Sequence, residues 1–203
     1  QMKFLSKIIV VPVIAGTMLF ACSSPESNQA DRYFEKGQYE LAVQTYTENL
    51  QNKPADVKSL YNRGRAYQEM GKFEEAQSDF EAALNSDPSN FQVLLSLSTI
   101  QLEQKNYASA LLYATKAEEI AGAPAMASFL KGRALHQLGL PEDALKAYGN
   151  AIQIDREFGQ AYFNRGMLKV ALDRTKQACE DFNLASSLEY PGAQEALQKY
   201  CGR

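Results

Sequence analysis

The chain has 203 residues, 45% of them hydrophobic and 22% charged, and a formal net charge of −3. This length and composition fit a single domain with a sizeable core. The charges are interspersed and form no basic block, which argues against nucleic acid as a partner.

Residues 1–21 have the organisation of a signal peptide. A basic start precedes an apolar run from Ile8 to Ala21. This run is shorter than the roughly 20 apolar residues that a membrane-spanning helix needs. The segment Leu19–Cys22 then resembles the lipobox of bacterial lipoproteins, which are cleaved before the cysteine.

The lipobox resemblance implies that Cys22 carries a diacylglycerol and an acyl chain such as palmitate. Several chains together anchor a protein firmly, whereas one binds only weakly. Ser23 after the cysteine favours the outer membrane, again by resemblance. Residues 22–28 would form a short tether, with the first helix starting near Asn28 as its N-cap. An ordinary cleaved signal with an incidental cysteine is the alternative.

The stretch Val57–Asn90 predicts a helical hairpin. Apolar and small residues recur at helical spacing in two runs, which Gly71 separates and Pro88 ends. Gly takes the left-handed conformation that ends a helix, and Pro cannot continue one. The two stripes are Leu60, Gly64 and Tyr67, then Phe73, Ala76, Phe80, Ala83 and Leu84.

A shift of 34 residues brings similar residues into register five times. Small residues recur at Ala30, Gly64, Ser98, Gly132 and Gly166. Alanine recurs at Ala42, Ala76, Ala110, Ala144 and Ala178. The units are 23–56, 57–90, 91–124, 125–158 and 159–192.

This period and its small-residue pattern resemble the tetratricopeptide repeat (TPR) family. The resemblance implies an all-α fold, a right-handed α-solenoid of helical hairpins over residues 29–192. Three units depart locally from the pattern. The third has no Gly in its turn, where we expect Asn106 to take that role. The fourth ends at Asp155 and Arg156 without Pro, and the fifth has Asp173 at its turn.

Residues 193–203 carry one further apolar stripe, which predicts a capping helix over the open end of the solenoid. Cys179 and Cys201 form an even pair in a secreted context, and a disulfide between them would hold this end down. Against it, strict repeat register turns Cys201 toward the groove. Two buried free thiols are the alternative.

The TPR resemblance implies that the first helices of the hairpins line a concave groove for a protein or peptide partner. Carried onto this chain, the groove residues are Tyr61, Arg65, Leu95, Leu102, Phe129, Arg133, Phe163 and Met167. We expect an apolar patch around Phe129, Phe163 and Met167, although residues such as Tyr61 also pack between repeats. The Lys/Asn/Arg carboxylate clamp of chaperone-binding TPR proteins is absent, because Ser27, Asp31, Tyr61 and Arg65 hold its places.

Arginine and aspartate stand 16 residues apart in two units, as Arg63 and Asp79 and as Arg165 and Asp181. We predict an ion pair between the two helices of each hairpin. Two solvated charges of little energetic effect are the alternative.

Catalytic chemistry has no candidate residues. The one histidine, His136, lacks companions at metal-ligand spacing, and we expect it in the groove or on the surface. Acidic pairs such as Glu118 and Glu119 fit solvated helix surface better than acid–base work. We therefore expect no enzyme, no cofactor and no metal. The predicted function is an interaction scaffold of the bacterial envelope; the alternatives are a pilotin-like assembly factor and an envelope enzyme with an unrecognised site.

Overall fold

The computed structural model describes residues 25–202, with side chains from Gln29 onward, and this range contains eleven α-helices and no strand. The expected signal peptide and the lipidation site at Cys22 lie outside the described residues. The helices are α1 (Pro25–Glu35), α2 (Tyr39–Asn52), α3 (Val57–Glu69), α4 (Phe73–Ser86), α5 (Phe91–Glu103), α6 (Tyr107–Glu118), α7 (Ala125–Gln137), α8 (Pro141–Ile154), α9 (Gly159–Ala171), α10 (Thr175–Ser187) and α11 (Ala193–Cys201).

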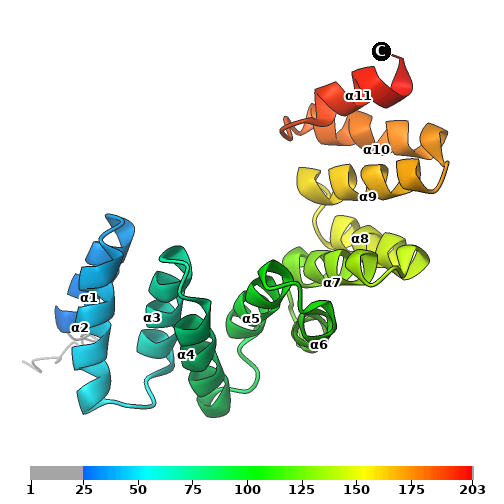
Figure 1. Cartoon of the computed structure of the whole chain (residues 1–203). Coiled ribbons are helices and arrows are strands. Elements are labelled where there is room, and N and C mark those ends of the chain that lie inside the picture. The colour runs from blue at the N-terminus through cyan, green and yellow to red at the C-terminus, as the bar shows by residue number, and fades with distance from the viewer. Residues whose placement is uncertain (1–24, 203) are drawn as a thin grey trace, which may run out of the picture.

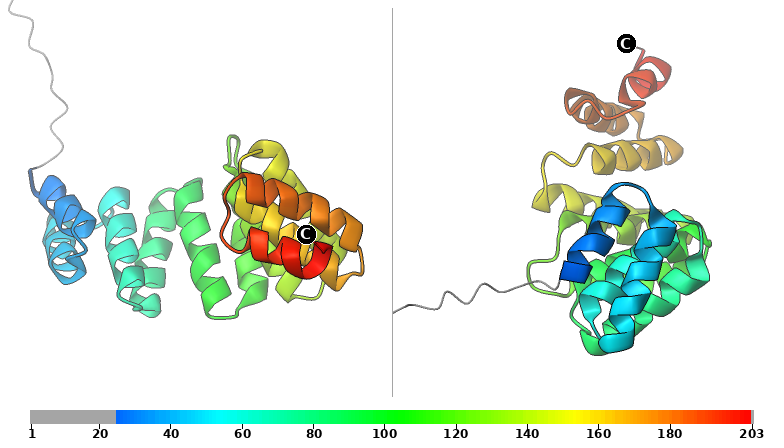
Figure 2. Two further views of the ribbon diagram at one scale, coloured as in Figure 1. Left: turned by 90° about the horizontal axis from the view of Figure 1, so that it is seen from above. Right: turned by 90° about the vertical axis from the view of Figure 1, so that its left-hand side faces the viewer.

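Consecutive helices pair into five hairpins that stack in chain order, and α11 packs on the last of them (Figure 1). The stack bends around α5–α8, so α1–α4 and α9–α11 form two arms (Figures 1 and 2). This is the all-helical solenoid that the 34-residue period predicts. The face formed by α3, α5, α7 and α9 is called the inner face below.

Local signals place the helix ends. Asp56 caps α3 by accepting a hydrogen bond from the backbone N–H of Ser59 at 2.8 Å, and Asn90 caps α5 in the same way. The expectation that Asn106 takes the role of Gly in the third turn is wrong. Lys105 has the positive φ of 61°, the conformation that Gly71 holds with φ 71°. The turn geometry is therefore retained even without Gly.

The first helix starts earlier than expected. It begins at Pro25, three residues before Asn28, and at 11 residues it is still shorter than the 13-residue α3. Pro is tolerated there because the first backbone N–H groups of a helix have no intrahelical acceptor. The proposed tether therefore loses residues 25–28 to the helix.

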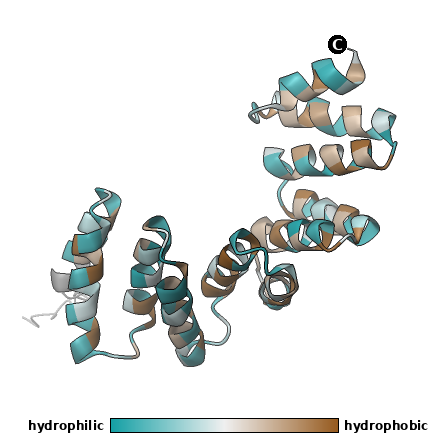
Figure 3. Ribbon diagram, viewed as in Figure 1, coloured by the Kyte–Doolittle hydropathy of each residue, from teal (hydrophilic) through white to brown (hydrophobic). Residues whose placement is uncertain are grey.

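Small residues let the two helices of a hairpin approach closely. The five recurring alanines are all 0% exposed. A Cβ added at Gly64, Gly132 or Gly166 would lie 2.7 Å from a ring atom of Phe80, Tyr148 or Phe182. Each aromatic ring thus fills the space that the missing side chain leaves. In Figure 3, apolar segments lie densely on α5, and α1–α4 alternate more between polar and apolar.

In the part of the chain that the structure describes, every helix is either too short or too polar to cross a bilayer.

Candidate functional site

A hollow of about 390 Å³ lies on the inner face in the second half of the chain. Its walls come from three successive hairpins, mainly through α5, α7 and α9, with one residue each from the turn before α6, from α6 and from α8. The lining residues are Leu102, Glu103, Lys105, Tyr107, Arg133, His136, Gln137, Tyr148, Asn164 and Met167. The hollow therefore brings together four residues that the sequence placed in or near the groove, namely Leu102, Arg133, His136 and Met167.

Arg133 is the distinctive group of this hollow. It forms no ion pair with any carboxylate among the described residues, and Glu103 and Lys105, which also line the hollow, bring one charge of each sign. Burial raises the pKa of Tyr148 to about 12, and the charge of Arg133 opposes this rise. Tyr148 is thus neutral at physiological pH and supplies no counter-charge to the guanidinium. A cation beside amide donors and apolar walls is suited to a carboxylate with an apolar neighbour.

The first half of the inner face has a different character. The guanidinium of Arg65 lies 4.6 Å from the ring centre of Phe34 and 5.9 Å from that of Tyr61, within the range of cation–π contacts. The ring of Tyr61 also packs against Phe80, with centroids 5.8 Å apart. Tyr61 therefore serves packing within its hairpin as well as the inner face.

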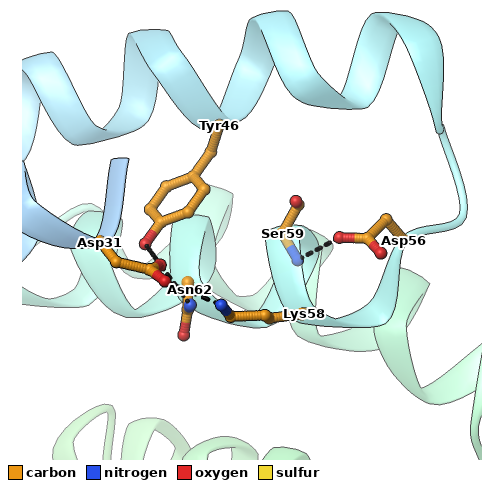
Figure 4. Close-up of polar contacts among 6 residues, drawn as sticks. All are labelled: Asp31, Tyr46, Asp56, Lys58, Ser59 and Asn62. Atoms are coloured by element: carbon orange, nitrogen blue, oxygen red, sulfur yellow. Dashed lines mark hydrogen bonds and ion pairs between the residues drawn. The ribbon is translucent and has the colours of Figure 1, made fainter. Parts of the chain in front are cut away.

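The carboxylate of Asp31 already has its partners. It accepts hydrogen bonds from Tyr46 Oη at 2.6 Å, Lys58 Nζ at 2.8 Å and Asn62 Nδ2 at 3.1 Å (Figure 4). Burial alone would raise the pKa of Asp31, but the hydrogen bonds from Lys58 and Tyr46 outweigh it and lower this pKa. The network joins the first hairpin to the second, and the sequence did not predict it.

The expected apolar patch on the inner face does not form, because its first member is buried. Phe129 is 1% exposed and packs between Tyr148, at a centroid distance of 5.8 Å, and Phe158, at 4.9 Å. Phe163 is half-buried against Phe182 and Tyr190. Phe129 is thus a core residue, since the loop before α9 supplies an aromatic ring that covers it. Leu95 is likewise half-buried against the core.

The two predicted Arg–Asp ion pairs are confirmed, and in both the aspartate is buried and the arginine half-buried. Arg63 binds Asp79 through Nε at 2.7 Å and through a terminal nitrogen at 2.6 Å, and it also donates to Thr47 of the preceding hairpin. Arg165 binds Asp181 in the same two-point manner, and Lys169 adds a second cation at 2.8 Å. Each pair thus ties the two helices of its hairpin together, and Arg63 also reaches the hairpin before it.

The junction between the third and fourth hairpins lacks this pair. Ala147 stands where Asp79 and Asp181 stand in their hairpins, and Lys131 bonds Glu118 at 2.6 Å instead. A hollow of about 510 Å³ remains there, on the outer side of α7. Glu118 also accepts from Ser128, so the expectation that it is simply solvated is wrong.

At the C-terminal end, a disulfide joins Cys179 in α10 to Cys201 in α11, with their Cα atoms 5.9 Å apart. Strict repeat register had argued against this pairing. The chain leaves that register between α10 and α11, where Glu189 has φ 55° and Gly192 has φ 81°. These two residues redirect α11 so that its last turn meets α10.

None of the described residues form a group of three or more His, Cys, Asp or Glu side chains that could hold a metal ion.

Comparison with protein families gives matches along nearly all of the described chain. A model described as Tetratricopeptide repeat matches residues 61–125 and 117–162. A model described as TPR repeat matches residues 30–71, and a further Tetratricopeptide repeat model matches residues 159–190.

Two curated relatives cover much of this chain. Tetratricopeptide repeat protein 6 of Homo sapiens is 28% identical over 162 residues, which is 77% of this chain and 31% of the relative. Protein CTR9 homolog of Arabidopsis thaliana is 30% identical over 183 residues, which is 86% of this chain and 16% of the relative. The chain thus spans less than a third of the length of either relative.

Solved structures resemble the fold along most of both chains. MamA from Desulfovibrio magneticus RS-1, from its residue 41 onward, superposes with a TM-score of 0.74 at 25% identity, covering 83% of this chain and 97% of that one. YrrB, described as a TPR protein with an unusual peptide-binding site, gives 0.69 at 22% identity, with 87% and 92% covered. PilW, described as a widely conserved type IV pilus biogenesis factor, gives 0.73 at 19% identity, with 80% and 76% covered. The likenesses to YrrB and PilW show the fold alone.

Proposed function

Because this chain belongs to the tetratricopeptide repeat family, we propose that it is an interaction scaffold that binds a segment of a partner protein on its inner face. The carrying observation is the hollow around Arg133, whose half-buried side chain forms no ion pair with a carboxylate of the described residues. The preferred ligand is a peptide segment that places a carboxylate on Arg133 and an apolar side chain near Leu102 and Met167.

A comparison within the chain supports placing the proposed binding site in the second half of the inner face. Arg133 follows Asp31 by three repeats of 34 residues, and Asn164 follows Asn62 by the same interval. In the first half, Asn62 donates to the chain's own Asp31 carboxylate. In the second half, the acid is replaced by Arg133, and Asn164 lines an open hollow. A carboxylate from a partner would complete the second arrangement.

Peptide binding can test this. A panel of peptides with a free C-terminal carboxylate would be compared with the same peptides amidated, by titration calorimetry on the whole chain in detergent. We expect Arg133→Gln to weaken binding of the free acids by about tenfold or more, because a charge-assisted hydrogen bond is lost. Arg65→Gln is the matched control, since Arg65 is also a cation of the inner face without an ion pair.

Two results would contradict the proposal. One is equal binding of acid and amide forms. The other is an equal loss in the Arg65→Gln and Arg133→Gln variants, which would indicate non-specific attraction. If neither result is seen, crosslinking in cells with the same two variants would identify the natural partner.

The proposal also holds that a lipid anchor at Cys22 keeps the scaffold at the bacterial envelope, most simply at the outer membrane. Its support is the basic start, the short apolar run and the cysteine that follows Leu19–Ala21. Cys22→Ser should move the protein from the membrane fraction to the soluble fraction. Retention of the variant in the membrane fraction would refute the anchor.

A pilotin-like assembly factor remains the alternative prediction, and the likeness to PilW, being one of fold, does not favour it. The scaffold and the assembly factor differ in how long they stay bound to the partner. A scaffold should stay in its complex at fixed stoichiometry, whereas a carrier should be found free of its client after assembly.

A further inference from the structure

The capping helix α11 depends on few contacts. It has nine residues, which is too short for a stable helix in isolation. Ala196 and Leu197 are buried, and the ring of Tyr200 stacks on Phe182 at a centroid distance of 6.1 Å. The other side of the helix is exposed and polar, with Gln194, Glu195, Gln198 and Lys199. Its docking therefore rests on one apolar stripe, which also includes the buried Ala193, on a hydrogen bond from Ser186 Oγ to Gln194 Oε1, and on the covalent link to α10.

The disulfide is placed so that it holds the end of α11 against α10. Cys201 is the last residue of α11, so the bridge to Cys179 closes a loop of sequence separation 22 that contains the whole cap. Cys201 is half-buried, and the next residue, Gly202, is exposed. Because Cys201 is only half-buried and ends the last helix, we expect a thiolate from solvent to reach its sulfur while the solenoid stays folded.

The surface under the cap is apolar. Ala178 and Phe182 are each 0% exposed, and both belong to the cluster that Ala196 and Leu197 complete. Met167 and Val170 of α9 pack against the same cluster. Since Met167 also lines the hollow of Arg133, the surface under α11 is continuous with the inner face.

From these three observations, we propose that the Cys179–Cys201 bridge is a redox-operated latch on α11. A dithiol reductant, of the kind with two cysteines close in sequence, attacks Cys201 Sγ through one thiolate and forms a mixed disulfide. The S–S bond breaks, and Cys179 leaves as a thiolate that takes up a proton. The second thiolate of the reductant then releases Cys201, so the reductant ends as a disulfide and the chain as two thiols.

Opening the latch frees α11 and exposes the face around Phe182, whereas the five hairpins stay folded. The disulfide closes a loop of this size and thereby strongly restricts the open state of α11. Loss of the disulfide should therefore raise the equilibrium constant for opening of α11 by on the order of a hundredfold. The inference concerns the cap alone and does not depend on which partner the inner face binds.

Hydrogen exchange read by mass spectrometry tests the latch. The whole chain would carry Cys22→Ser, which leaves Cys179 and Cys201 as its only thiols. Peptides from 193–201 would be compared with peptides from α7 and α8, before and after treatment with dithiothreitol without denaturant. We expect exchange in 193–201 to rise about a hundredfold and exchange in α7 and α8 to stay unchanged. Alkylation and intact mass would verify that both thiols are free.

The double variant Cys179→Ser, Cys201→Ser is the control, and it should show the reduced pattern with or without dithiothreitol. Three outcomes would overturn the proposal. The first is a bridge that yields only in denaturant. The second is unchanged exchange in 193–201 with both thiols free. The third is equal acceleration in α7 and α8, which would mean that the bridge holds the fold as a whole.

Discussion

Replacing Gly132 by alanine tests the close approach of α7 and α8. The new Cβ would lie 2.7 Å from two ring atoms of Tyr148 and 3.2 Å from a third. Tyr148 is 1% exposed and packs against Phe129, so its ring has no free space to turn into. Overpacking of this kind costs about 1–3 kcal/mol.

Gly149→Ala is a matched control in the next helix. There the nearest atom to the new Cβ is a terminal nitrogen of Arg165 at 3.7 Å, an ordinary contact. Both substitutions replace a glycine inside a helix and gain about 0.5–1 kcal/mol from helix propensity. Their difference in free energy of unfolding therefore isolates the overpacking cost of about 2 kcal/mol.

Urea unfolding followed by circular dichroism measures this difference. We expect Gly149→Ala to raise the urea midpoint and Gly132→Ala to lower it, with similar slopes. Equal midpoints for the two variants, or a higher midpoint for Gly132→Ala, would refute the account of ring-over-glycine packing.

Two further predictions concern carboxylates that have partners in the structure. Asp181→Ala leaves Arg165 and Lys169 without their counter-charge, so the free energy of unfolding should fall by about 3–5 kcal/mol; a loss under about 1 kcal/mol in urea unfolding would show that the pair is dispensable. Asp31 has a folded-state pKa below its ordinary value of 3.8, so its stabilising effect is present above that pH and is lost as the pH falls through the folded-state pKa. Hydrogen exchange in α1–α3 should accordingly rise below about pH 4. Asp31→Asn should remove this part of the pH dependence, and an unchanged acid response in that variant would contradict the assignment.

Local, repeated features of the structure could be predicted from the sequence. The 34-residue period places hairpins because each unit repeats the same small residues and the same stops. The Arg63–Asp79 and Arg165–Asp181 pairs followed from equal spacing in two units. The turn at Lys105 was misjudged because the position in the turn, and not the residue type, decides where the left-handed conformation falls.

The candidate site could be predicted only in part. The repeat register assigns Phe129 to the groove side of α7, but it does not show whether another residue covers its ring. Phe158, from the loop before α9, packs on that ring and covers it. The Asp31 network joins Tyr46, Lys58 and Asn62 from separate helices, so no local pattern announces it. The hollow at Arg133 likewise depends on side chains of three hairpins.

The way the junctions are filled means that the five hairpins are not interchangeable parts. Thr47 accepts a hydrogen bond from Arg63 of the next hairpin, and Glu118 accepts one from Lys131 of the next hairpin. If the second and fourth hairpins exchanged places, Arg63 would keep Asp79 and meet Thr115, which corresponds to Thr47, but Lys131 would face Thr47 and lose Glu118. The fourth hairpin is thus matched to the third, and their order is itself a structural property. Deletion of the third hairpin would take Glu118 away from Lys131 even though the helical period is kept.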